Sequence, residues 1–232
     1  MNIYGTTIFI GETTVDTIYG IFKAHTFQSL ISAKLYITAL IYGDINHPEL
    51  YTRIHSSCVT SETICGMDCD CVEQLNGALE KIAEKKHGIL FYLIQEGRGA
   101  GYVAKAMDRM VVQYSQDTIS TFEAYAKQGL ANDLRDYTCI KDICKMMNID
   151  SEFILLTNNP DKVKALKDMN IKVKRKESLE YTPGPFNMAY LQSKQQYGHE
   201  LSAVIHKTLD INKYSKFRVK PFIPHPLITL PR

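Results

Sequence analysis

The cysteines are the residues whose types and spacing most directly suggest chemistry. Four of the six lie within residues 58–71, at Cys58, Cys65, Cys69 and Cys71. Zinc binds thiolates in a tetrahedral arrangement, and a C-x-C pair such as Cys69 and Cys71 can place two sulfur atoms on one ion where a loop enters a helix. Cys58 would be a third ligand from a neighbouring strand. Three protein ligands leave the fourth position to water, as in catalytic sites, whereas a closed set that includes Cys65 would be structural.

A competing interpretation treats cysteines as small buried hydrophobic side chains. We favour it for Cys139 and Cys144, which lie five residues apart on a predicted helix, and it remains open for single members of the cluster. Metal binding is favoured for Cys58, Cys69 and Cys71. A helix beginning at Cys71 would also lower thiolate pKa values, which assists metal binding.

Apolar periodicity indicates the elements that must position these thiols. Residues 34–43 and 87–95 are short runs rich in β-branched and aromatic residues, typical of buried strands, and the chain between them has helical spacing from residue 71 onward. Farther on, the pattern predicts helix over 135–149, strand over 152–157, helix over 160–170 and strand over 171–176. The predicted fold class is α/β, a single domain of mixed β-sheet with flanking helices over residues 1–206. A basic, proline-containing C-terminal tail is expected over residues 207–232.

Composition excludes some classes of function. The chain of 232 residues is 45% hydrophobic and 22% charged, with a formal net charge of +2 and no long run of lysine or arginine. This balance does not indicate binding to nucleic acid or to a charged membrane surface, so an anionic ligand needs a local site. The N-terminal residues lack the features of a signal peptide, and no window approaches the roughly 18 apolar residues of a membrane span. We therefore expect a cytoplasmic protein, in which clustered cysteines are more often metal ligands or reactive thiols than disulfides.

Five motifs occur in an order that is specific as a set. They are RIHSSC (53–58), CDCVEQL (69–75), QEGRGAG (95–101), DLRDY (133–137) and LLTNNPDKV (155–163). Alone, EGRGAG is typical of a flexible turn, TNNP of a helix cap and DLRDY of a surface ion pair. Together the motifs resemble GTP cyclohydrolase II, the zinc enzyme that opens the guanine imidazole ring at the start of riboflavin synthesis. The resemblance covers roughly residues 15–200.

The resemblance implies a role for each matching residue. Cys58, Cys69 and Cys71 match the zinc ligands, which would activate a water to attack C8 of guanine, and Cys65 has no counterpart. The positions that match GTP-binding residues are Arg53, Ile54, His55, Ser56, Ser57, Gln74, Glu96, Gly97, Arg98, Thr118, Thr157 and Lys162. Glu96 and Gln74 are assigned to the exocyclic edge of guanine. The resemblance also implies Mg²⁺ with the triphosphate and a homodimer.

Asp133 and Arg135 match the general base and the nucleophile proposed for the family. A carboxylate near a metal-bound water is a reasonable proton acceptor. A guanidinium, however, stays protonated in nearly all settings and is a poor nucleophile. From physical chemistry we interpret Arg135 as a clamp that stabilises charge as pyrophosphate leaves.

The sequence departs from the family pattern after the glycine-rich motif. By ungapped counting Arg109 occupies the position of a catalytic tyrosine, and residues 119–129 form a link about three residues longer than in the family. Tyr102, Tyr114 and Tyr125 are candidates to substitute in space. The expected activity is hydrolysis at C8 with release of formate and pyrophosphate to give a diaminopyrimidine. The alternatives are a formylamino-pyrimidine product, use of another guanine nucleotide, and a nucleotide-binding protein without catalysis.

Overall fold

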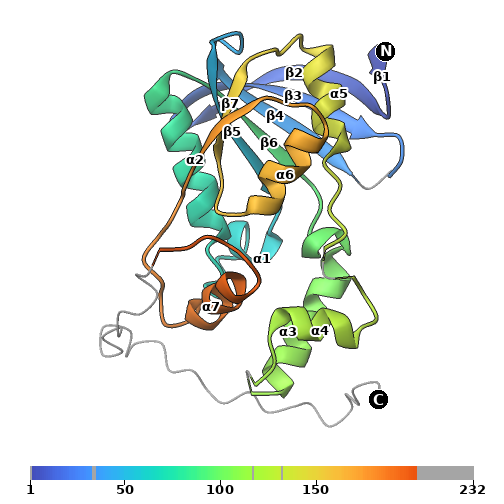
Figure 1. Ribbon diagram of the computed structural model, residues 1–232, viewed down its shortest axis with the longest axis vertical. Coiled ribbons are helices and arrows are strands. Elements are labelled where there is room, and N and C mark those ends of the chain that lie inside the picture. Colours follow the sequence, from blue (N-terminus) through green and yellow to red (C-terminus); the bar gives the residue numbers. More distant parts are fainter. Residues whose placement is uncertain (1, 33–34, 117, 132, 203–232) are drawn as a thin grey trace.

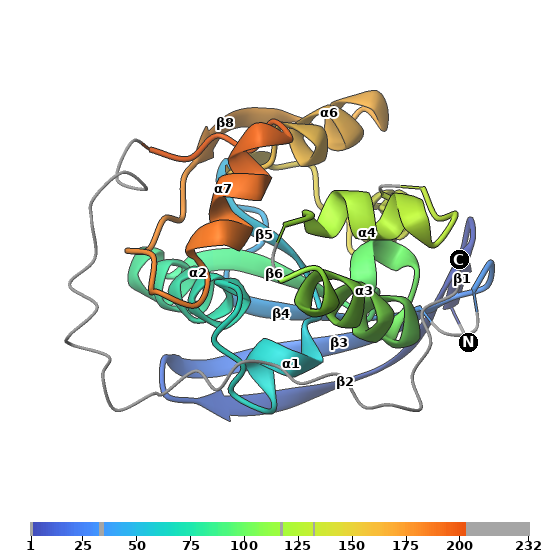
Figure 2. The same ribbon diagram turned by 90° about the horizontal axis from the view of Figure 1, so that it is seen from below.

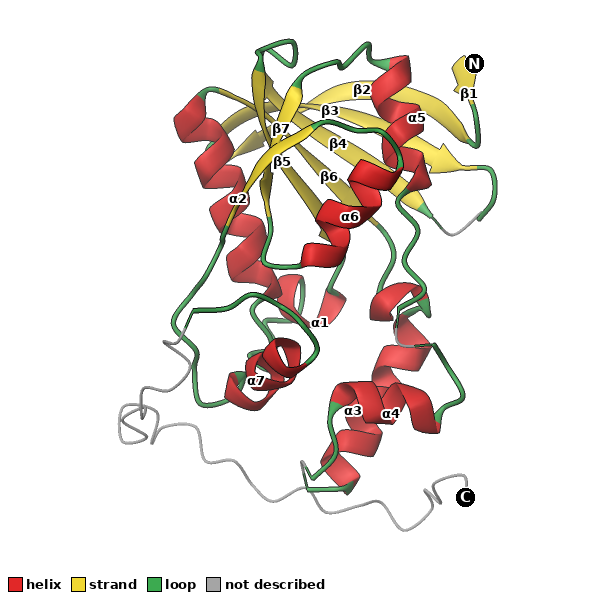
Figure 3. Ribbon diagram, in the orientation of Figure 1, coloured by secondary structure: helices red, strands yellow, loops and turns green. Residues whose placement is uncertain are grey.

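One mixed β-sheet organises the protein (Figures 1 and 3). The computed structural model describes residues 2–32, 35–116, 118–131 and 133–202. In these residues eight strands form a sheet in the order β1-β2-β3-β4-β6-β5-β7-β8. The strands are β1 (Asn2–Tyr4), β2 (Thr7–Thr17), β3 (Gly20–Ser29), β4 (Tyr36–Gly43), β5 (Glu49–Ser56), β6 (His87–Leu93), β7 (Glu152–Leu156) and β8 (Val173–Glu177). The pairs from β1 to β4 and the β4–β6 pair are antiparallel, whereas β6, β5, β7 and β8 are parallel neighbours.

Helices cover the parallel part of the sheet on both faces. Their bounds are α1 (Val59–Glu62), α2 (Cys71–Lys85), α3 (Tyr102–Tyr114), α4 (Thr121–Lys127), α5 (Thr138–Met146), α6 (Pro160–Asp168) and α7 (Met188–Gln196), with a 3₁₀ turn, η1, at Gly97–Gly99. Helix α2 packs on one face, and α5 and α6 pack on the other (Figure 1). Helices α3, α4 and α7 lie beyond one end of the sheet, together with α1 (Figures 1 and 2).

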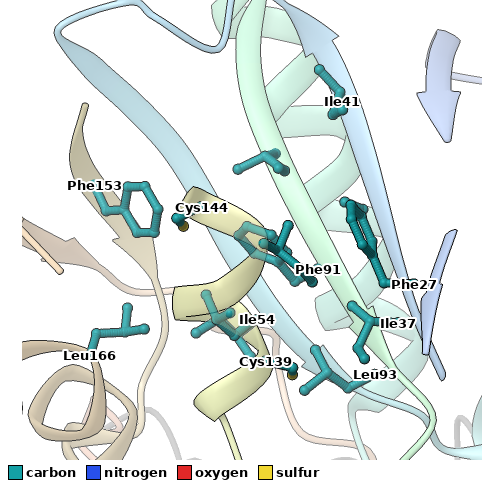
Figure 4. Close-up of a cluster of buried hydrophobic side chains, with 14 of the residues drawn as sticks. Phe27, Ile37, Ile41, Ile54, Phe91, Leu93, Cys139, Cys144, Phe153 and Leu166 are labelled. Atoms are coloured by element: carbon teal, nitrogen blue, oxygen red, sulfur yellow. The ribbon is translucent and has the colours of Figure 1, made fainter. Parts of the chain in front are cut away.

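The core lies in two layers because successive side chains of a strand point to opposite faces. On β6, Ile89, Phe91 and Leu93 pack against α5 and α6, whereas Leu90 packs against α2. The larger cluster contains Cys139 and Cys144, which are 3% and 6% exposed (Figure 4). The prediction that these two cysteines are buried apolar side chains is confirmed.

The elements predicted from periodicity are present with shifted ends. The runs at 34–43 and 87–95 become β4 and β6, both central in the sheet, and the predicted helix after residue 71 becomes α2. The predicted α/β class with a mixed sheet is confirmed. Residues 207–232, the predicted tail, lie outside the described residues. Within the described part of the chain, no helix combines the length and the apolar character needed to cross a membrane.

Candidate active site

The three cysteines of the predicted metal set converge where strand β5 and helix α2 meet. Cys58 follows the end of β5, Cys69 lies in the loop before α2, and Cys71 is the first residue of that helix. Their Sγ atoms all lie within 4.8 Å of one another, with Cys58 and Cys69 3.7 Å apart, and none forms a disulfide. Cys65 is exposed, has a φ of 58°, and is not part of this group.

This donor set fits a zinc ion. Three thiols close together at the wall of a cavity offer one face of a tetrahedron and leave one position to a small ligand. Hydrogen bonds from Cys69 and Cys71, followed by the Lys105 ammonium, lower the pKa of the Cys58 thiol, so the cluster favours a thiolate. The structure thus brings together Cys58, Cys69 and Cys71 and leaves Cys65 out, which matches the set that the resemblance implies.

A lysine that the sequence analysis did not select lies beside the cysteines. Lys105, in the first turn of α3, places its Nζ 2.8 Å from the Cys58 Sγ and 2.6 Å from the Glu96 Oε1. The other carboxylate oxygen of Glu96 accepts a hydrogen bond from the Val59 amide at 3.0 Å. Glu96, predicted to bind substrate, therefore has both oxygens engaged by protein groups and does not line the cavity described next.

The site cavity is the concave space bounded by the cysteine cluster, α3, α7 and the carboxyl ends of β5 and β7. Its wall includes the three cysteines, Arg135 and, from the predicted substrate-binding set, Arg53, His55, Ser56, Ser57, Gln74, Gly97, Arg98, Thr157 and Lys162. Side chains from five separate motifs are thereby brought to one place. Asn159 explains part of this arrangement, because its side chain caps α6 by accepting from the Asp161 amide at 2.8 Å, with Pro160 opening the helix.

Besides Glu96, two predicted substrate-binding residues lie off this wall for reasons of geometry. Ile54 stands between Arg53 and His55 on β5, so strand alternation turns its side chain to the opposite face, into the core. Its carbonyl still accepts a hydrogen bond from the Lys162 Nζ at 2.9 Å. Thr118 is exposed in the link between α3 and α4 and borders a neighbouring space, here called the side cavity.

The wall of the site cavity is rich in buried cations. Arg53 is 4% exposed and donates from its Nη1 to the Leu156 carbonyl at 2.8 Å. Burial, reinforced by Arg53, Arg135 and Lys194, holds the pKa of Lys162 well below its usual range. So many cations at one wall, in a chain with a net charge of only +2, favour an anionic ligand.

Asp133 and Arg135 form an ion pair at the edge of the site. The Arg135 Nε lies 2.8 Å from the Asp133 Oδ1, and Nη2 donates to Oδ2, so the two groups meet as a fork. Arg135 lines the cavity, but Asp133 does not. Burial opposes the charge of Arg135, but the hydrogen bond to Asp133 outweighs it and raises the pKa of the guanidinium.

Helix α3 carries Arg109, the residue that ungapped counting puts at the position of the family tyrosine. Arg109 places its Nη1 2.7 Å from the Oδ2 of Asp68, in the loop that holds Cys69. Of the three tyrosines considered as substitutes, only Tyr125 is on the wall of the site cavity, and it is 1% exposed. Its hydroxyl lies against Gly97, where an added Cβ would be 3.0 Å away. Tyr102 is half-exposed and lies off the wall.

Sequence reasoning missed several further wall residues. Lys105 and Asp108 could have been found, since they follow the glycine-rich motif at helical spacing. Tyr190 and Lys194 come from α7, where no motif marks them. The Nζ of Lys194 lies 2.6 Å from the Oδ1 of Asp70, between two of the cysteines. This contact joins α7 to the loop that carries the cysteines.

Comparisons with known proteins identify the family of the chain. The GTP cyclohydrolase II family profile matches residues 8–178. GTP cyclohydrolase-2 of Shewanella loihica is 33% identical over 196 residues, which cover 84% of this chain and 93% of the relative. GTP cyclohydrolase-2 of Tolumonas auensis is 36% identical, with 83% of this chain and 96% of the relative covered. GTP cyclohydrolase-2 of Hahella chejuensis is 37% identical, with 84% of this chain and 92% of the relative covered. A crystal structure of RibBX, a two-domain 3,4-dihydroxy-2-butanone 4-phosphate synthase from A. baumannii, aligns with a TM-score of 0.43 at 14% identity, covering 76% of this chain and 41% of that one. The chain belongs to the GTP cyclohydrolase II family and is an enzyme of that family.

Proposed function

We propose that the protein is a zinc-dependent hydrolase that opens the imidazole ring of GTP at C8, releasing formate and pyrophosphate to give a diaminopyrimidine ribosylamino phosphate. The observation that carries the proposal is the cluster of Cys58, Cys69 and Cys71 on the wall of a cavity that also holds buried cations. A bound zinc ion would supply Lewis-acid activation of water at this wall. The family's place at the start of riboflavin synthesis makes that pathway the proposed context.

The buried cations would hold the triphosphate, together with Mg²⁺. Arg53, Arg98 and Lys162 border the cavity and bring three positive charges to its wall, where phosphate oxygens can pair with them. Gly97, with a φ of 58°, adopts a backbone conformation that a side chain would strain, which suits close approach of the chain to a ligand. Ser56, Ser57, Gln74, His55 and Thr157 complete the proposed GTP-binding set.

Arg135 is proposed to act as a charge clamp on the departing pyrophosphate. Its raised pKa disfavours the neutral guanidine that a nucleophile requires, whereas a fixed cation stabilises the charge that develops on phosphate oxygens. Asp133 holds the fork of Arg135 in this arrangement. Its pKa is lowered, since the hydrogen bonds from Arg135 outweigh the opposing effect of burial, and this makes it a weak proton acceptor until the pair opens.

A second product is proposed as the alternative, because Arg109 replaces a phenol. Tied to Asp68, Arg109 offers a fixed charge and no hydroxyl, so the formyl group would stay on the pyrimidine if no other group promotes its loss. Tyr125 is the candidate for that group, since its hydroxyl is at the cavity wall beside Gly97. Another guanine nucleotide as substrate is a further alternative.

The test is mass spectrometry of the products formed by zinc-loaded protein from GTP and Mg²⁺, with formate and pyrophosphate assayed in the same tube. Formate, pyrophosphate and a diaminopyrimidine support the proposal, and loss of formate release in Tyr125→Phe would assign the hydroxyl. A product that keeps the formyl carbon, with formate release restored in Arg109→Tyr, supports the alternative. Intact GTP after incubation with metal-replete protein refutes both and leaves a binding role.

Two further proposals concern the assembly and the location of the protein. A homodimer is expected, which sedimentation at several concentrations would test. Cytoplasmic location is also proposed, and it requires the thiols of the cysteine cluster to remain reduced. Neither changes the assignment of the site residues.

A further inference from the structure

Asp108 is a buried carboxylate that the proposed reaction leaves without a role. It lies on α3 and is 5% exposed. Its Oδ1 is buried and has no hydrogen-bond donor within the described residues. A buried polar atom without a partner costs free energy, so its persistence in a cavity wall points to a donor supplied by a ligand.

The cations around Asp108 are already engaged by other groups. Lys105 contacts Cys58 and Glu96, Arg109 contacts Asp68, and the guanidinium of Arg98 stacks 3.5 Å from the centre of the Phe122 ring. Burial, the largest effect, raises the pKa of Asp108 to about 7 in spite of these neighbours. The carboxylate is therefore held near positive charge but lacks the donors that would fully stabilise it.

The groups first assigned to the guanine edge are not free to bind it. Glu96 has both carboxylate oxygens in use, as described above. Gln74 accepts from the Nη2 of Arg53 through its Oε1 and donates to Asp70 through its Nε2. A base that binds with C8 at the cysteine cluster would need its N1–H and 2-amino donors met by another acceptor.

We propose that Asp108 is that acceptor, binding the N1–H and the 2-amino group of guanine through its two carboxylate oxygens. This inference rests on the proposed function and adds to it the residue that selects the base. Asp108 is one helical turn from Lys105, which touches Cys58, so it lies on the same face of α3 as the group beside the metal site. Asp108 and Tyr190 both line the site cavity and the side cavity. The ring of Tyr190 offers an aromatic face on which the base can stack.

The test is to compare the binding of GTP, inosine triphosphate and xanthosine triphosphate to zinc-loaded protein and to Asp108→Asn. Inosine triphosphate lacks the 2-amino group, and xanthosine triphosphate carries a carbonyl oxygen in its place. A carboxylate pairs with two donors, whereas an asparagine amide pairs with one donor and one acceptor. Dissociation constants from calorimetry without Mg²⁺ give a readout that does not depend on turnover.

We expect wild-type protein to bind GTP about 10- to 100-fold more tightly than the other two nucleotides. In Asp108→Asn the GTP affinity falls by a similar factor, and the ratio of xanthosine to guanosine triphosphate affinity rises by at least about 10-fold. Loss of the Asp108 charge can change the binding of every triphosphate equally, and the ratio of the two affinities cancels such a change. Asp16→Asn, an exposed position on β2, is the matched control and should leave all three constants unchanged.

Two results overturn the inference. Equal weakening of all three nucleotides in Asp108→Asn would make Asp108 a structural or general electrostatic group, and unchanged constants would show that it does not touch the base. Both leave the proposed function intact if wild-type protein still opens GTP. Failure of wild-type protein to bind any of the three refutes the proposed function and the base-selecting role together.

Discussion

Lys194→Met should destabilise the docking of helix α7 on the loop that holds the cysteines. The Nζ of Lys194 and the Oδ1 of Asp70 are 2.6 Å apart, and the two side chains are 11% and 6% exposed, so solvent screens the pair little. Burial alone would raise the pKa of Asp70, but Lys194 and the hydrogen bond from Gln74 outweigh it and keep the pKa below its usual range. Methionine keeps the apolar stem but leaves the carboxylate buried without its counter-ion.

Removing one partner of a buried ion pair costs about 3–5 kcal/mol. The observed loss cannot exceed the free energy that docks α7, because the helix can detach before the sheet unfolds. We therefore expect a loss of about 2–4 kcal/mol in urea denaturation at constant zinc, accompanied by faster proteolysis of the segment that contains α7. The exposed pair of Lys172 and Asp150, at 2.9 Å, provides the control, and Lys172→Met should cost about 0–1 kcal/mol.

The double variant Lys194→Met with Asp70→Asn decides whether the buried charge is responsible. A neutral asparagine needs no counter-ion, so the double variant should be more stable than Lys194→Met alone, with a coupling of about 2 kcal/mol. Zinc content is measured in every variant because Asp70 lies between two cysteines of the cluster. If the losses in free energy of unfolding of the two single variants add up in the double variant at equal zinc content, the reasoning is refuted and Lys194 contributes only by packing.

Three further predictions concern the metal, the glycine-rich loop and pH. Cys58→Ser should lose zinc in elemental analysis, whereas Cys65→Ser should retain it; equal loss would make the site structural. Gly99 has a φ of +87°, and an added Cβ would lie only 2.6 Å from backbone atoms, so Gly99→Ala should weaken GTP binding and cost about 1–3 kcal/mol of stability. Gly198 has a similar φ of +90° but open space around it, so Gly198→Ala should leave GTP binding unchanged. Burial lowers the pKa of His55 from 6.5 to about 4. Between these two pH values the imidazole is protonated in the unfolded chain but neutral in the folded protein. The free energy of unfolding should fall toward pH 4 by up to about 1.4 kcal/mol per pH unit, and His55→Gln should flatten this part of the urea-denaturation profile.

Strands β6 and β7 of the parallel half of the sheet were predictable because they are buried on both faces. Residues 87–95 and 152–157 are nearly continuous apolar runs, and such runs are recognisable without knowledge of their partners. The N-terminal strands β2 and β3 were not predicted. β2 has few buried side chains, and its exposed threonines interrupt the apolar signal on which strand recognition depends.

The site was predictable where a motif holds its residues in one short segment. The cysteine cluster follows from a C-x-C pair at a helix start, and its third member, Cys58, lies 11 residues before Cys69. The contribution of α7 was not predictable, since Lys194 is separated from Asp70 by 124 residues and a lysine on a helix is ordinarily solvated. Ile54 was assigned to the site because it stands inside a motif, although strand alternation turns its side chain into the core.

Helix α3 connects several parts of the candidate site. Lys105, Asp108 and Arg109 occupy positions i, i+3 and i+4, so they share one face of the helix. Lys105 contacts Cys58, Arg109 contacts Asp68 beside Cys69, and Asp108 lines the cavity between them. A rotation of α3 would therefore move Lys105, Arg109 and Asp108 together. Substitutions on this face should consequently be non-additive in metal retention and nucleotide choice, and an exchange of Arg109 for tyrosine must be interpreted together with the freed carboxylate of Asp68.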